Sequence, residues 1–113
     1  MQFTVETVDE VTVLTYSENA MTSTNAGEFR REVTPFLEKG GQLVLDLRKV
    51  SFLDSSALGI LLACLRQLNE AGGDLKLCGL TKQVRQVIEL VRFNRVFDIL
   101  ESREQAVTAY AKG

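Results

Sequence analysis

Residues 43–47 read LVLDL, and residues 52–59 read FLDSSALG. The first run is nearly continuous in apolar residues, which is typical of a central strand covered on both faces. In the second run, Asp54-Ser55-Ser56 precedes an apolar stripe at helical spacing, which is typical of a helix with a polar N-terminal cap. The stripe consists of Leu58, Leu61, Cys64, Leu65 and Leu68. We therefore predict a buried strand followed by an amphipathic helix.

The chain after this helix predicts a second parallel strand. Gly72-Gly73 ends the helix, and residues 75–78 alternate between apolar and other side chains. A strand, a helix and a further strand in this order favour a crossover connection with parallel pairing.

The segment before residue 43 predicts a hairpin and a first helix. Residues 3–7 and 11–15 alternate around Asp9-Glu10, which indicates two antiparallel strands and makes the sheet mixed. Apolar residues then recur at helical spacing behind a possible cap at Asn25, with Glu28 three residues later. We expect a kink or an early end at Pro35. Gly40-Gly41 closes this segment.

The last third of the chain predicts two helices around a short strand. Thr81 can cap a helix whose apolar face ends near Asn94, a residue that tolerates the left-handed conformation. Residues 96–100 then form an edge strand, and Ser102 with Gln105 forms a capping box before a terminal helix. The predicted fold class is α/β, with a mixed sheet of about five strands packed with four helices.

Length and charge restrict the function classes. A chain of 113 residues fits a single domain, which we assign to residues 1–113. The net charge is −2 and the basic residues are scattered, so we expect no nucleic-acid partner. The longest apolar stretch, residues 57–65, is too short to span a membrane, and the N-terminus lacks the features of a signal peptide. We expect a cytoplasmic protein.

The residue types that are absent argue against catalysis. The chain has no histidine, which removes the usual general base and the common zinc ligand. No Ser-x-x-Lys spacing surrounds Ser55, so that serine has no evident base either. Cys64 and Cys78 both lie in apolar patterns, which favours buried reduced thiols. We predict no enzyme, no cofactor and no metal site.

The block from residue 43 to residue 59 closely resembles the signature of STAS domains in anti-sigma factor antagonists, and the resemblance extends over residues 41–111. It implies a single STAS domain with the elements predicted above. Family members typically carry Gly-Glu-Leu-Asp after the second strand, where residues 16–20 of this chain read YSENA. In antagonists this region forms part of the surface that docks the partner kinase.

The resemblance also implies a regulatory mechanism centred on Ser55, the serine directly after the aspartate. An anti-sigma factor with serine kinase activity phosphorylates this residue in the family. The unphosphorylated antagonist binds that anti-sigma factor and releases a sigma factor, and a metal-dependent serine phosphatase later removes the phosphate. Ser55 is then a switch and not a nucleophile.

The other polar residues near Ser55 are assigned structural roles, functional roles or both. Asp54 can orient the Ser55 hydroxyl for a kinase, cap the helix, or do both. We assign structural roles to Ser56 and, in the absence of a charged partner, to Asp46. Arg48-Lys49 and the pair Arg92 and Arg95 either sense a phosphate or acidic patch or are simply solvated. A second hypothesis for the chain is an unregulated STAS adaptor in a stress-signalling assembly or a lipid-transport complex.

Overall fold

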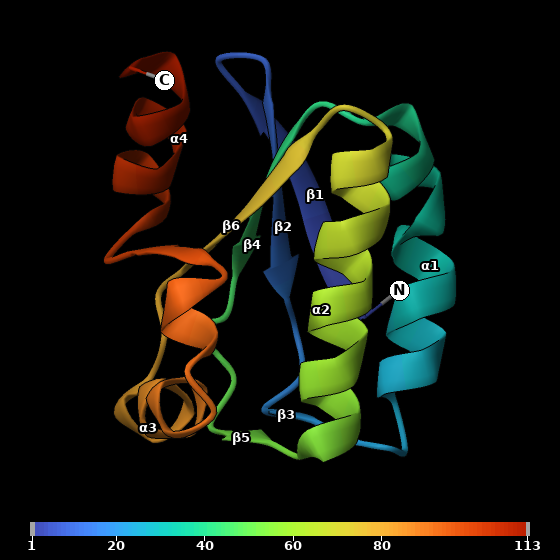
Figure 1. Ribbon diagram of the computed structural model, residues 1–113, viewed down its shortest axis with the longest axis vertical. Helices are drawn as coiled ribbons and strands as arrows, with labels where there is room; N and C mark the ends of the chain where they lie inside the picture. Colours follow the sequence, from blue (N-terminus) through green and yellow to red (C-terminus); the bar gives the residue numbers. More distant parts are fainter. Residues whose placement is uncertain (1, 113) are drawn as a thin grey trace.

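The structure is a computed structural model that describes residues 2–112, and its centre is a five-stranded mixed sheet (Figure 1). The strand order is β1-β2-β4-β6-β7, with β1 antiparallel to β2 and every other pair parallel. The middle strand β4 contains the LVLD run, which confirms the predicted central strand. The strands are β1 (Phe3–Val8), β2 (Val11–Tyr16), β4 (Gln42–Asp46), β6 (Asp74–Cys78) and β7 (Asp98–Leu100).

Four helices surround the sheet, as predicted. Helices α1 (Ala26–Lys39) and α2 (Ser55–Glu70) lie together on one face, and α4 (Arg103–Lys112) lies on the other (Figure 1). Helix α3 (Lys82–Leu90) and the short 3-10 helix η1 (Phe93–Arg95) lie toward the end of the sheet where the parallel strands finish. No helix in the described range is both long and apolar enough to cross a membrane.

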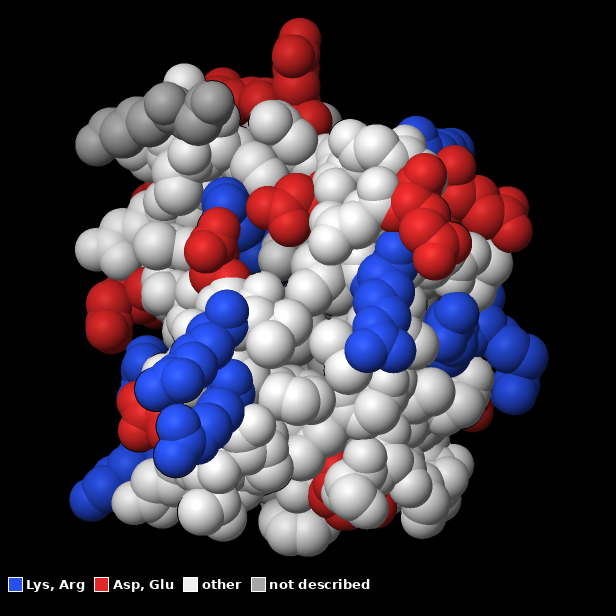
Figure 2. Space-filling view, in the orientation of Figure 1, with Lys and Arg blue, Asp and Glu red and all other residues white. Residues whose placement is uncertain are grey.

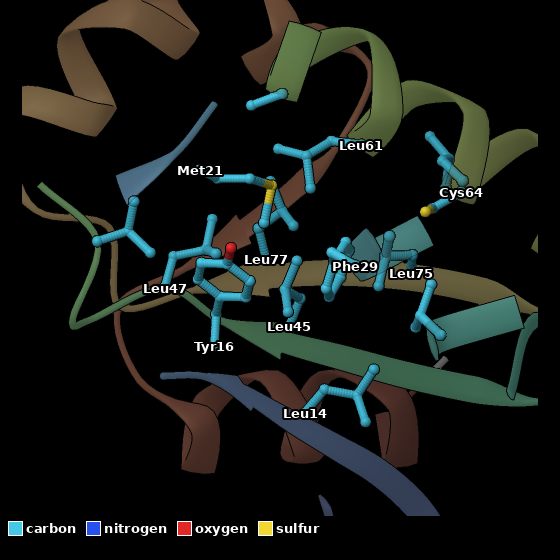
Figure 3. Close-up of a cluster of buried hydrophobic side chains, with 14 of the residues drawn as sticks. Leu14, Tyr16, Met21, Phe29, Leu45, Leu47, Leu61, Cys64, Leu75 and Leu77 are labelled. Carbon is cyan, nitrogen blue, oxygen red and sulfur yellow. The ribbon is translucent and has the colours of Figure 1, made fainter. Parts of the chain in front are cut away.

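The larger core lies between the sheet and the helices α1 and α2 (Figure 3). It joins inward side chains of the central strands to one stripe from each helix, and the ring of Phe29 meets that of Tyr16 edge-on at 5.4 Å. Cys64 lies in this core, and burial raises the pKa of its thiol to about 11. The labelled members in Figure 3 are Leu14, Tyr16, Met21, Phe29, Leu45, Leu47, Leu61, Cys64, Leu75 and Leu77.

A smaller core lies under α4 on the opposite face. There the Tyr110 hydroxyl lies 2.7 Å from the carbonyl oxygen of Leu43 and 2.8 Å from that of Asp74, at the amino ends of β4 and β6. Cys78 is buried in this core, and burial raises the pKa of its thiol to about 12. Both cysteines are therefore free, buried thiols, as predicted.

Two details of the predicted elements are wrong, and one of the two alternatives at Pro35 is ruled out. Helix α1 does not end early at Pro35 but continues to Lys39, because its buried face continues beyond the proline and packing outweighs one lost backbone bond. The Asn25 side chain does not cap α1, since its oxygen accepts from the Thr22 amide instead. Helix α3 ends at Leu90, and the residue in the left-handed conformation is not Asn94 but Arg92, at φ 63°.

Two features near the sheet edge were also not anticipated. Strand β7 begins only at Asp98, so Val96 and Phe97 precede it. A second, two-stranded parallel sheet joins β3 (Ala20–Met21) to β5 (Phe52–Leu53). Two-residue strands carry too little periodicity to be predicted. This small sheet matters because β5 leads directly into the Asp54-Ser55-Ser56 triplet.

Candidate functional site

The candidate site is the amino-terminal end of α2, where Ser55 is the first helical residue. The N-cap position belongs to Asp54, whose carboxylate accepts from the Ala57 amide at 2.9 Å. Capping is thus performed by the aspartate, and the Ser55 hydroxyl is not needed for it. Ser55 and Ser56 are both exposed. The hydroxyl of Ser55 stands in solvent at the positive end of the helix dipole.

Asp54 also joins two segments of the chain. Its second carboxylate oxygen accepts from the backbone amide of Ser23 at 2.9 Å, which links α2 to the loop that precedes α1. Hydrogen bonds from the Ala57 and Ser23 amides stabilise the charged form and lower the pKa of this carboxyl below its usual value. Asp54 is therefore an ionised group that fixes the backbone on both sides of Ser55.

The segment that departs from the family pattern lies beside this site. Backbone bonds join Asn19 to Ser51 at 2.8 Å, and β3 pairs with β5 through Ala20 and Met21. Residues 17–19 are exposed. Residues 17–19 of this stretch and the triplet therefore share one surface at the carboxyl ends of the parallel strands, while Tyr16 lies in the core (Figure 1).

Asp46 has a charged partner, which the sequence did not reveal. The carboxylate is 2% exposed at the end of β4 and accepts from the backbone amide of Arg48 at 3.0 Å. It also accepts from the Arg103 guanidinium on α4 at 3.1 Å and 3.3 Å. The same guanidinium donates to the Thr15 hydroxyl at 2.6 Å and pairs with Glu6. Asp46 anchors α4 and the start of the loop to β5, and its carboxylate is not part of the triplet's bonds.

The basic residues that the sequence offered as phosphate or acidic-patch sensors fall into two groups. Arg48 lies 3.6 Å from Asp46 and is partly engaged there. Arg92 and Arg95, which flank Asn94, are exposed around η1. None of them is hydrogen-bonded to the triplet within residues 2–112.

Sequence reasoning missed three contributors to this region. The contact of Arg103 with Asp46 could not be predicted, because one arginine in the first turn of a predicted helix is normally solvated. The bond from the Ser23 amide to Asp54 could not be predicted either, because a backbone donor is not marked by any residue type. Phe52 is 55% exposed beside the triplet, and the sequence did not single it out. Alternation along β5, where Leu53 is buried, explains why the ring is exposed.

The chemistry available at this end of α2 is recognition and modification. An exposed hydroxyl beside free helix-terminal amides accommodates a phosphate without disturbing the core. The sequence has no imidazole, and within residues 2–112 no side-chain amine is hydrogen-bonded to the triplet as the base that an activated serine nucleophile needs. Within the described range, no cluster of three or more acidic or cysteine side chains could hold a metal ion.

Comparisons with known proteins agree with this geometry. The family model of the STAS domain matches residues 2–106. A relative from Bordetella bronchiseptica, named as the anti-sigma factor antagonist BtrV, is 31% identical over 111 residues, covering 97% of this chain and 95% of the relative. The chain belongs to the STAS domain family of anti-sigma factor antagonists.

Other members of the STAS family share both sequence and fold with this chain. The anti-sigma-B factor antagonist of Bacillus subtilis is 28% identical over 83 residues, which covers 74% of this chain and 76% of the relative. The crystal structure of an anti-sigma factor antagonist from Thermotoga maritima superposes with a TM-score of 0.86 at 28% identity, covering 95% of this chain and 92% of the other. The mixed sheet with four helices is the STAS fold.

Proposed function

We propose that this chain is a phosphorylation-controlled protein-binding switch whose signal is carried by Ser55. In the unphosphorylated state it binds an anti-sigma factor that has serine kinase activity, and this binding releases a sigma factor. Phosphorylation of Ser55 ends the binding, and a serine phosphatase restores it. The relative from Bacillus subtilis, named as an anti-sigma-B factor antagonist, supports an anti-sigma factor as the partner.

The main support for this proposal is that Asp54 makes the structural hydrogen bonds at the start of α2, whereas the Ser55 side chain makes none that the fold needs. Asp54 makes the capping bond to Ala57 and the bond to Ser23, so the neighbouring hydroxyl is exposed and unused by the fold. A kinase can therefore reach Ser55 without opening the structure. The exposed ring of Phe52 adds an apolar contact for a partner at the same place.

The electrostatic effect of phosphorylation is large enough for control. A phosphoserine adds about −1.5 to −2 charges at pH 7. Asp54 stays ionised because its pKa is lowered, so the two groups form one concentrated negative site. A partner carboxylate at ~6 Å feels roughly 3 kcal/mol of repulsion per added charge at an effective dielectric near 20. Even after salt screening halves this energy, it exceeds the ~1.4 kcal/mol of a tenfold affinity change.

Residues 1–113 act as a single STAS domain in the cytoplasm, with protein partners and no nucleic acid, cofactor or membrane insertion. The chain has no catalytic activity of its own, because it lacks histidine and Ser55 has no base. Asp54 orients and fixes the site, and Ser56 and Asp46 have structural roles.

The test measures labelling and binding with the cognate anti-sigma factor kinase. Incubation with kinase and ATP is expected to add one phosphate, placed on Ser55 by peptide mass spectrometry. Ser55→Ala is expected to bind the partner constitutively, and Ser55→Asp to bind at least about tenfold more weakly. Both variants keep the parent's circular dichroism spectrum, because the side chain makes no contact that the fold requires.

Ser56→Ala is the matched control, since Ser56 is also an exposed serine on the same helical turn. It is expected to be labelled and to bind like the parent. Labelling at Ser56, or unchanged affinity in both the phosphorylated chain and the Ser55→Asp variant, contradicts the switch. Those results favour the unregulated STAS adaptor.

A further inference from the structure

Exposed aliphatic side chains gather where α3 ends and η1 begins. Leu90 is 82% exposed, Val91 42% and Val96 50%, all within seven residues. We name residues 89–96 the α3–η1 surface. Single exposed aliphatic residues are ordinary, but a group of them surrounded by polar residues is typical of a contact site.

Two arginines of the same segment have no ionic partner. Arg92 and Arg95 are exposed and form no ion pair within residues 2–112, whereas Arg48, Arg85 and Arg103 each do. Glu89 is the acidic residue of the surface, so the surface carries a net charge of +1 (two positive, one negative). Figure 2 shows Lys and Arg side chains gathered over α3 and η1 at the lower left.

The backbone of this surface is held in one conformation. Arg92 is left-handed, at φ 63° and ψ 26°, which costs roughly 1–2 kcal/mol for a residue with a Cβ. Backbone bonds fix the turn on either side, from the Arg92 amide to Glu89 and from the Arg95 amide to Arg92. The two guanidinium groups therefore stand on a preformed turn, and binding there requires little backbone ordering.

The surface is connected to the candidate site through α3. The Thr81 hydroxyl, at the start of α3, donates to the carbonyl oxygen of Val50 at 2.7 Å, just before β5. A helix of nine residues then spans about 13 Å to Leu90. A protein partner that contacts Phe52 and Ser55 can therefore also contact the α3–η1 surface through one further segment of its chain.

We propose that the α3–η1 surface binds an acidic amphipathic segment of the anti-sigma factor, with an apolar side chain among Leu90, Val91 and Val96 and carboxylates at Arg92 and Arg95. This inference rests on the proposed function and adds a second contact to it, away from Ser55. Charge complementarity favours a protein partner, because two arginines fall short of the four to eight basic residues that mark a lipid-headgroup site.

The charged half of the surface is tested with the double variant R92E/R95E in the full chain. Its matched control is R31E/R66E, which reverses two exposed arginines on α1 and α2. R92E/R95E is expected to bind the anti-sigma factor about tenfold more weakly, through a slower association rate, and to lose the salt dependence of that rate. The control is expected to stay within about twofold of the parent.

The apolar half is tested with Leu90→Ser, and Val8→Ser at the far hairpin is the control. Leu90→Ser is expected to raise the dissociation rate about tenfold and to keep the parent's unfolding curve. All variants remain substrates for phosphorylation on Ser55. If the surface variants bind like their controls while Ser55 phosphate still releases the partner, the inference is wrong and the proposed function stands. If the parent chain binds no anti-sigma factor, both are wrong. Binding to phosphatidylcholine–phosphatidylserine vesicles that R92E/R95E abolishes, with protein affinity unchanged, also overturns the inference.

Discussion

At the scale of single residues, Asp54 combines the roles that most affect Ser55. One carboxylate oxygen caps α2 through Ala57, and the other holds the loop at Ser23. Replacing Asp54 with a side chain of the same shape but no charge keeps the helix cap and removes the titrating group, so the two contributions can be measured separately. Asparagine is such a residue, because it caps helices about as well as aspartate.

Asp54 therefore predicts a pH effect on stability. Its folded pKa is lowered, so its contribution to stability is complete above the ordinary aspartate value and is lost as the pH falls through the folded pKa. The difference in unfolding free energy between the parent and Asp54→Asn should shrink as the pH falls from above the ordinary aspartate pKa through the lowered pKa of Asp54. Urea unfolding at several pH values measures it. Asp54→Ala, which has no cap, should be less stable than Asp54→Asn throughout, and a pH-independent difference between parent and Asp54→Asn contradicts the assignment.

At the scale of elements, one guanidinium group joins the start of α4 to three strands, in addition to the apolar contacts and the Tyr110 hydroxyl farther along the helix. The Arg103 side chain is 19% exposed and bonds to Asp46 on β4 and Thr15 on β2. It also pairs with Glu6 on β1. Removal of one partner from a buried ion pair leaves the other charge uncompensated.

Arg103→Met is accordingly expected to lower the unfolding free energy by about 3–5 kcal/mol, because the buried Asp46 then keeps only the mostly exposed Arg48, 3.6 Å away, as a charged partner. Adding Asp46→Asn should recover part of that loss. Glu6→Gln is the control, since Glu6 is half exposed and its pairing contributes under about 1 kcal/mol. Denaturant unfolding measures all four proteins. An Arg103→Met chain as stable as the Glu6→Gln chain would show that the Arg103 guanidinium does not stabilise the docking of α4.

The elements differ in how well the sequence predicts them. The central strand and α2 are predictable because each buries a regular pattern, continuous in β4 and helical at Leu61 and Leu68. The course of α1 past Pro35 is not, because propensity penalises a proline that tertiary packing overrides. The left-handed turn at Arg92 is also unpredictable, since local preference favours Asn94.

The candidate site shows the same division. Ser55, Asp54 and Ser56 are contiguous, so a motif suffices to find them. The contacts that fix them come from afar: Ser23 lies 31 residues before Asp54, and Arg103 lies 57 residues after Asp46. Patterns within a single sequence do not indicate which residues so far apart in the chain come into contact. The ring of Phe52 is exposed because of the register of β5, and a two-residue strand is too short for its register to be predicted from the sequence.

At the scale of the whole molecule, two apolar layers of unequal size lie on the two faces of the sheet. Leu61 is fully buried at the centre of the larger layer. Leu61→Ala is expected to lower the unfolding free energy by roughly 2–5 kcal/mol, as truncation of core leucines does. Leu90→Ala, at a leucine that is 82% exposed, should change it by under about 0.5 kcal/mol. Equal effects of the two substitutions would mean that the buried face of α2 is misassigned.

The docking of α4 also has a consequence for the order in which the molecule is assembled during synthesis. The sheet face under α4 contains Val13 and Val44, which pack with Ala106 and Tyr110. Helix α4 follows all five strands in the chain, so the strands can leave the ribosome before the helix that covers this face. Until α4 docks, that side of the sheet is open to chaperones and to other nascent chains. The docking of α4 is then the step that closes the smaller core during co-translational folding.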